Sequence, residues 1–309
     1  MEFLKSTNID FLSRRRFAYV ISSALIVIGF VSLILHGGPN YGIDFKGGTS
    51  IIFRFHDPVT TADIREALTP AALGRSEIKT FGAENEYVIY VEQQEEASAS
   101  DMVEKVEAAI STAFPEGRYD ILQEETVGPK IGRELRGSAI KAMVFALLLI
   151  LIYISMRFEF VFAVGAVAAL FHDVLITLGI FSLFNFEVSL KEIAAFLTLI
   201  GYSLNDTIVV YDRIRENLKV MRSEELPNLI NRSINQVLSR TAITSVTTFI
   251  VVLILYLFGG EVLKGFAFVM VVGVIVGTYS SIFVASPLIV EWQNRHGGKQ
   301  QLRMAKKKR

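Results

Sequence analysis

Residues 194–217 read AAFLTLIGYSLNDTIVVYDRIREN, an apolar segment that is long enough to enter a lipid bilayer and carries Asn205 and Asp206 inside it. Its charged end begins at Asp212, which we take as the edge of the membrane. Because an α-helix rises about 1.5 Å per residue, Asp206 then lies roughly 9 Å inside the hydrocarbon. Hydrocarbon offers a carboxylate no water, so this position indicates a transport or proton pathway. The alternative is an acid that serves only in helix packing.

Polar residues of the same helix are candidate partners for this acid. At 100° per residue, Thr198, Tyr202 and Asn205 share a broad face with Asp206. We therefore expect hydrogen-bond partners within the helix itself. Ser203 lies on another face, so the polar stripe is not continuous.

The composition predicts an integral membrane protein, because 51% of the 309 residues are hydrophobic and only 20% are charged. The chain has no cysteine, which excludes disulfides and cysteine metal sites. Six apolar segments are long enough to span a bilayer. They are residues 17–36, 138–156, 160–181, 192–211, 241–258 and 266–290. The first is too long for a signal peptide and no cleavage site follows it, so we interpret it as an uncleaved span.

The distribution of lysine and arginine predicts the orientation of these spans. Basic residues concentrate in the N-terminal segment 1–16, the loop 212–240 and the tail 291–309, whereas the opposing loops 184–191 and 259–264 carry one each. Both termini are therefore expected on the cytoplasmic side. The basic tail follows a span, so we expect it to contact membrane lipids and not nucleic acid.

One large soluble domain is expected between the first two spans, at 37–137 and on the external side. It has 18 acidic and 10 basic residues, a formal charge of −8, which argues against nucleic-acid binding. Its patterns give the order strand, helix, strand, strand, helix, strand, which is a ferredoxin-like α+β sandwich. The expected strands are 51–55, 77–81, 86–92 and 119–126, and the expected helices begin at Thr60 or Thr61 and at Ser98 or Ser100.

Two segments border this domain. The paired glycines Gly47 and Gly48 indicate a tight turn where backbones approach closely; a phosphate-binding loop is disfavoured because no Gly-Lys-Ser/Thr follows. Residues 128–136 are punctuated by Gly and Pro and link the domain to the second span. They either transmit movement between domain and membrane or form a passive linker.

Three further features of the membrane segments bear on function. Asp173, beside His172 in the third span, either is a second acid on a proton route or hydrogen-bonds a neighbouring helix. Residues 226–240 form an amphipathic helix that we expect along the cytoplasmic surface. Arg240 then either points inward as the partner of a carboxylate or anchors the span. The hydroxyl-rich stretch 239–248 suits close helix packing or a hydrated path.

Four motifs in order carry a resemblance over nearly the whole chain: YGIDFKGG after the first span, LFHDVLITLGIF in the third, SLNDTIVVYDRIREN in the fourth and NQVLSRTAITSVTTF entering the fifth. Together they resemble the SecF side of the SecD/SecF family of protein-export membrane proteins, in the resistance-nodulation-division (RND) superfamily. The resemblance implies a six-transmembrane-helix bundle, one half of an RND-type pair, with one external ferredoxin-like domain. It also implies a multi-pass protein of the bacterial inner membrane.

The resemblance also implies which residues act. Asp206 matches the family's intramembrane acid and Arg240 its arginine at the fifth span, while Asp173 and Asn205 lie in family motifs with less sharply implied roles. Further motif positions, without a proton-coupling role, are Gly42, Asp44, Gly47, Gly48, Asp212 and Arg213.

The implied activity is use of the proton-motive force, without a cofactor, to help pull or release exported chains. The implied partners are SecD, YajC, the SecYEG channel and unfolded secretory polypeptides. In this scheme Asp206 takes up a proton from outside and releases it inward, with Arg240 and a SecD carboxylate setting its proton affinity. Alternatives are a half-transporter that exports lipid or small hydrophobic compounds by proton antiport, and a structural scaffold subunit. No nucleophile–base pair, phosphate loop or metal-ligand spacing is recognised in the sequence, so an enzyme is least favoured.

Overall fold

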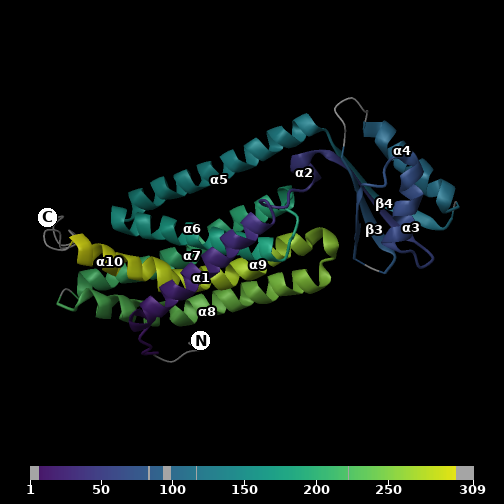
Figure 1. Ribbon diagram of the computed structural model, residues 1–309. Helices are drawn as coiled ribbons and strands as arrows, with labels where there is room; N and C mark the ends of the chain where they lie inside the picture. Colours follow the sequence, from purple (N-terminus) through teal and green to yellow (C-terminus); the bar gives the residue numbers. More distant parts are fainter. Residues whose placement is uncertain (1–6, 83, 93–98, 116, 222, 297–309) are drawn as a thin grey trace.

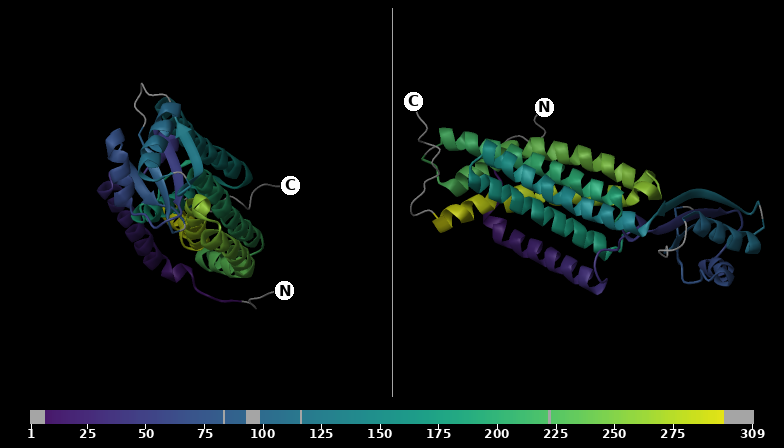
Figure 2. Two further views of the ribbon diagram at one scale, coloured as in Figure 1. Left: turned by 90° about the vertical axis from the view of Figure 1, so that its right-hand side faces the viewer. Right: turned by 90° about the horizontal axis from the view of Figure 1, so that it is seen from above.

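The computed structural model describes residues 7–82, 84–92, 99–115, 117–221 and 223–296. Within them, six helical segments are long and apolar enough to cross a membrane: 12–35, Pro129–Arg157, Phe160–Leu183, Leu190–Val220, Leu226–Phe258 and 261–295. These segments pack side by side, and a small α+β domain extends from one end of the bundle (Figure 1). The start of α1 (Arg15–Leu35) and α10 (Ser286–His296) lie at the opposite end (Figure 2). The predicted fold class is confirmed.

The α+β domain has the predicted element order. Its strands are β1 (Gly48–Phe55), β2 (Glu77–Thr80), β3 (Glu86–Val91) and β4 (Tyr119–Val127). They form an antiparallel sheet in the order β2-β3-β1-β4, with Ile51 opposite Ile89 on one side and Glu124 on the other.

The helices α3 (Thr61–Leu68) and α4 (Ala99–Ala113) cover one face of this sheet (Figure 1). The core between them is built from alternate strand residues such as Ile51, Phe53 and Ile89 together with Ile64 and Ile110. Thr60, one of the two residues expected to begin this helix, caps α3, and it does so in a reciprocal capping box with Asp63. Of the two residues proposed to begin the second helix, Ser98 lies outside the described residues.

The predicted link 128–136 is helical, so the second membrane helix begins before the expected residue 138. Helix α5 begins at Pro129 and continues without a break to Arg157. Proline suits the first helical turn, where its missing N–H is not needed. The first turns of α5 pack on the short helix α2 (Ile43–Lys46), where a Cβ at Gly132 would lie 3.0 Å from the Gly47 nitrogen.

The prediction of a separate surface helix at 226–240 is wrong. Helix α8 runs continuously from Leu226 to Phe258, because no glycine or proline interrupts the chain at 240. The apolar face of its first turns, which includes Leu229, Ile230 and Ile234, is buried within the bundle core and not spread along a membrane surface. Of the tail 291–309, residues 297–309 lie outside the described part, as do residues 1–6 at the other terminus.

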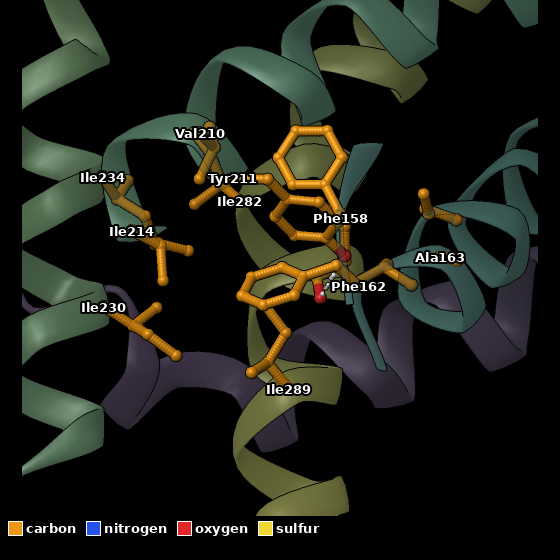
Figure 3. Packing of buried hydrophobic residues seen from close by; sticks show 14 of the residues in the cluster. Phe158, Phe162, Ala163, Val210, Tyr211, Ile214, Ile230, Ile234, Ile282 and Ile289 are labelled. Carbon is orange, nitrogen blue, oxygen red and sulfur yellow. Dashed lines mark hydrogen bonds between the residues drawn. The ribbon is translucent and has the colours of Figure 1, made fainter. Parts of the chain in front are cut away.

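The bundle core has an aromatic centre near the end of α5. Phe158 and Phe162, at the junction of α5 and α6 (Phe160–Leu183), surround Tyr211 of α7 (Leu190–Val220) (Figure 3). The Tyr211 hydroxyl donates to the Ala285 carbonyl at 3.0 Å, so this buried polar group is satisfied. Ala285 ends a π-helical turn, Ser281–Ala285, between α9 (Glu261–Ser280) and α10.

Candidate functional site

Asp206 lies near the middle of α7 and is only 1% exposed. Its Oδ2 accepts a hydrogen bond from the Ser245 hydroxyl of α8 at 3.2 Å. Thr278 of α9 lies 2.8 Å from the same hydroxyl. The acid is therefore held at the meeting of three helices, and among the described contacts Ser245 is its hydrogen-bond partner.

The partners expected from the same helix are not used. Thr198 is exposed and donates to the Ala194 carbonyl of its own helix at 2.8 Å. Asn205 is exposed, and the buried Tyr202 hydroxyl has no hydrogen-bond partner among the described residues. Thus Asn205 is beside Asp206 in sequence but faces the outside of the bundle, because successive helix residues point about 100° apart.

Arg240 is exposed on α8, five residues before Ser245. Five residues turn a helix by about 140° beyond one full turn, so these two side chains leave α8 in different directions. In the described part of the chain no ion pair joins Arg240 to Asp206. An interaction between them therefore stays a prediction, and it would require a change of position or a further chain.

Asp173 is also 1% exposed, but it sits in a dense polar network. Its Oδ1 is 2.8 Å from Nδ1 of His172, and its Oδ2 accepts hydrogen bonds from the hydroxyls of Ser203 on α7 and Ser280 on α9. His172 Nε2 is in turn 2.8 Å from the Ser22 hydroxyl of α1. This network joins α1, α6, α7 and α9 through one carboxylate.

The sequence patterns do not single out Ser22, Ser280 or Thr278, and they place Ser203 on a different face of its helix from Asp206. Each is a single hydroxyl in an apolar helix, a pattern that marks helix contacts in membranes without naming the partner helix. The hydroxyl-rich stretch 239–248 was the one signal for Ser245.

The two acids differ in what they can do chemically. Asp173 has three partners, so changing its protonation would disturb the contacts of four helices at once. Asp206 has one hydroxyl partner, and a hydroxyl can either donate to a carboxylate or accept from a carboxylic acid. Asp206 is therefore the acid that can gain and lose a proton with the smaller local rearrangement.

The motif residues after the first span form a joint between the domain and the helices. Asp44 accepts a hydrogen bond from the Leu190 nitrogen, at the first residue of α7, at 2.8 Å. Gly42 donates its backbone N–H to the Val188 carbonyl at 2.9 Å. Gly47 has φ +80° and leaves no room for a side chain, because a Cβ there would lie 2.6 Å from Pro129 Cα. A Cβ on Gly48 would meet the Val91 carbonyl at the same distance.

The remaining predicted positions lie at the other end of α7. Asp212 is 3.6 Å from Arg157, the last residue of α5. Arg213 contacts Glu216 at 2.8 Å and Gln236 of α8 at 2.7 Å. These half-exposed contacts tie the ends of three helices together. No group of three or more acidic, histidine or cysteine side chains suited to a metal occurs in the described residues.

Comparisons with known proteins agree along the chain. Residues 105–295 match the family model described as protein export membrane protein SecD/SecF, C-terminal, and residues 32–59 match the SecD/SecF GG motif. A protein translocase subunit SecF of Rhodothermus marinus is 46% identical over 99% of this chain and 100% of its own length. One from Desulfurispirillum indicum is 47% identical over 95% of this chain and 94% of its own.

Among solved structures, the crystal structure of SecDF, a translocon-associated membrane protein from Thermus thermophilus, superposes with a TM-score of 0.84 at 40% identity. The match covers 94% of this chain but 39% of that one. The chain described above therefore corresponds to less than half of the SecDF polypeptide.

Proposed function

Because the chain belongs to the SecD/SecF family of protein export membrane proteins, we propose that it is the SecF-type subunit of a Sec accessory complex that uses the proton-motive force to promote translocation or release of exported polypeptides. Two relatives that match over nearly full length are named protein translocase subunits, which supports a transport role over catalysis of a chemical conversion. The similarity to 39% of a SecDF chain supports a SecD-type half as the partner.

The proposal places the protein in the bacterial inner membrane with both termini in the cytoplasm and the α+β domain outside. The concentration of lysine and arginine at the ends of the helices away from that domain supports this orientation. YajC and the SecYEG channel complete the proposed set of protein partners. Unfolded secretory polypeptides are the proposed cargo.

The observation that carries the proposed mechanism is the buried Asp206, with Ser245 as its one described partner inside a membrane-spanning helix. A carboxylate in that position takes up a proton from the external side, loses its charge and releases the proton inward. One charge crossing 100 mV is worth about 2.3 kcal/mol, which is enough to shift a population between two conformations about fiftyfold. Arg240 would favour the charged acid whenever the two approach each other.

The joint at the external end supports transmission of that change. Helix α7 carries Asp206 and is tied at Leu190 to Asp44, and α5 is packed against Gly47. Gly47 directly precedes β1, and Asp44 lies four residues before it in the short helix α2. Movement of α7 relative to α5 therefore acts on the sheet directly, without a flexible linker between.

The test compares wild type with Asp206→Asn in vesicles that contain the assembled complex. Proton-motive-force-dependent release of a secretory precursor is measured, with Glu216→Gln as the matched control, an exposed acid-to-amide change on the same helix. We expect Asp206→Asn to assemble normally and lose only the proton-dependent increment, and Glu216→Gln to keep it. An assembled Asp206→Asn complex with the full increment would show that this acid serves only in packing.

A further inference from the structure

The mechanism proposed above leaves the buried Asp173 of α6 without a role. Its Oδ2 accepts hydrogen bonds from Ser203 of α7 and from Ser280 of α9, so a single oxygen atom joins these two helices. A carboxylate oxygen has more than one lone pair and can hold both hydroxyls at once. Asp173 therefore fixes how α7 lies against α9.

The same two helices build the surroundings of Asp206. On α7, Ser203 lies three residues before Asp206, and on α9, Thr278 lies two residues before Ser280. The Thr278 hydroxyl is 2.8 Å from that of Ser245, which donates to Asp206 at 3.2 Å. Each helix thus contributes to both polar groups within about one turn.

Helices α7 and α9 approach each other closely at this level. A Cβ on Gly277 would lie 3.1 Å from the Ser203 Cβ, and one on Gly273, a turn away on α9, would meet the Leu199 side chain. Small residues at such a contact let two membrane helices pack at short range. Sliding α9 by one residue, about 1.5 Å, would bring a larger side chain to this contact. The two helices therefore fit together in one register.

The other oxygen of Asp173 secures a third contact to α9. His172, the titratable group next to this acid, has Nδ1 2.8 Å from Asp173 Oδ1 and Nε2 2.8 Å from the Ser22 hydroxyl of α1. Tyr279 of α9 stacks on the His172 ring at 6.0 Å between centroids, and its hydroxyl is 3.1 Å from that of Ser22. In the part of the chain that the structure describes, no ion pair reaches Asp206.

We propose that Asp173 is a positioning residue for proton binding at Asp206. By holding Ser203 and Ser280 it fixes α7 against α9, and this arrangement keeps the Ser245 hydroxyl on the Asp206 carboxylate. A donated hydrogen bond favours the charged carboxylate over the acid, so its loss lets Asp206 keep its proton to a higher pH. The inference rests on the proposed function, because it names what sets the proton binding of the acid on which that function depends.

The experiment is an infrared titration of the assembled complex in lipid vesicles. The carbonyl stretching band of protonated Asp206 is identified as the band that Asp206→Asn lacks, and its intensity is followed against pH. Ser245→Ala removes the hydrogen bond directly. We expect it to move the midpoint of the band to higher pH by about one unit, the size of one lost hydrogen bond to a charged group.

The variants that test positioning lie away from Asp206. Ser280→Ala and Ser203→Ala each remove one donor to Asp173, and we expect both to move the Asp206 midpoint in the same direction as Ser245→Ala. The control is Ser182→Ala, which removes a buried hydroxyl pair between α1 and α6 at 3.0 Å, nine residues beyond Asp173. The control should keep the wild-type midpoint, because it leaves α7 and α9 in place. Co-purification with the partner subunit verifies assembly of each variant.

A double variant separates positioning from a direct effect of the Asp173 charge. If Asp173 acts through Ser245, adding Ser280→Ala to Ser245→Ala should give no further shift, since the hydrogen bond to Asp206 is already lost.

Two results would overturn the inference. The first is a wild-type midpoint in assembled Ser280→Ala and Ser203→Ala complexes, which would show that the two polar groups are independent. The second is a shift in the double variant equal to the sum of the single shifts. The proposed function fails separately, if Asp206→Asn vesicles keep the full proton-dependent release, because the infrared titration measures proton binding and not release.

Discussion

A backbone-to-backbone contact between two membrane helices gives a quantitative prediction for stability. Gly29 of α1 and Gly179 of α6 face each other directly: a Cβ on Gly29 would lie 2.7 Å from Gly179 Cα, and one on Gly179 would lie 2.6 Å from Gly29 Cα. Cβ atoms essentially never come closer than 3.0 Å to such an atom and ordinary contacts begin at 3.4 Å, so Gly29→Ala must move the helices apart by about 0.3–0.7 Å. The atoms that the added Cβ would meet belong to the backbone of Gly179, which cannot rotate away as a side chain would.

The cost follows from two effects. Overpacking of this kind costs about 1–3 kcal/mol. The same interface holds the Ser32–Ser182 hydroxyl pair at 3.0 Å, and losing that hydrogen bond would add about 1 kcal/mol. We therefore expect Gly29→Ala to destabilise the protein by about 2–4 kcal/mol. Gly29→Ala with Gly179→Ala should cost less than the sum of the two, because the first substitution already separates the helices.

The assay is unfolding of the purified subunit in mixed micelles, followed by helical circular dichroism. The control is Gly137→Ala in α5, where nothing lies within 4 Å of the added Cβ. Alanine is the better helix former, so this control should be neutral or stabilising by up to about 1 kcal/mol. If Gly29→Ala is no less stable than Gly137→Ala, the two helices do not meet through these glycines and the packing argument is refuted.

Three further predictions concern the external joint and the buried network. In the same unfolding assay, Gly47→Ala should lower the free energy of unfolding by about 1–3 kcal/mol more than Gly37→Ala. Both glycines have a positive φ, but only a Cβ on Gly47 would meet Pro129, so equal losses of stability would contradict this prediction. Burial raises the pKa of Glu187, although the positive charge of Lys79 at 3.8 Å opposes this shift, so above the ordinary glutamate range the folded state keeps a proton that the unfolded state has lost. Stability should therefore fall as the pH rises through that region. Glu187→Gln should remove this pH dependence of the thermal unfolding temperature, and an unchanged dependence would assign it to another group. Ser280→Ala removes a hydrogen-bond donor to buried Asp173 and should lower the free energy of unfolding by about 1–3 kcal/mol. The control is Thr198→Val, because the Thr198 hydroxyl bonds only to its own helix, and its stability should stay within about 0.5 kcal/mol of wild type. Similar losses of stability in the two variants would refute the role of the network.

Several features of the fold are readable from the sequence because their signals are local. Apolar runs of about 20 residues define membrane spans, since each span satisfies its backbone hydrogen bonds internally. The α+β domain is predictable for a similar reason: Thr60 and Asp63 form a cap within four residues, and alternation places Ile51 and Phe53 on one face. The presence of Asp206 inside such a run is also readable from the sequence, but its burial is not, because Asn205 in the same run is exposed.

The two errors at helix boundaries have a common cause. Residues 128–136 contain glycine and proline, and residues 226–240 are amphipathic, so each was interpreted from its own composition. In the structure Gly132 is a contact point for Gly47, and the apolar face with Leu229 and Ile230 enters the bundle core. Each segment continues into the membrane helix that follows it, and each packs against residues that are distant in the chain.

Local patterns in the sequence are sufficient to identify the apolar spans, the order of elements in the α+β domain and the acid inside the fourth span. The packing of the helices is needed to show that Asp206 accepts a hydrogen bond from Ser245 of α8, that Asp173 accepts hydrogen bonds from Ser203 and Ser280, and that Arg240 is exposed. Helical periodicity fixes the direction of a side chain relative to its own helix. The choice of neighbouring helix depends on how the surfaces of several helices fit together, and no local pattern records that choice.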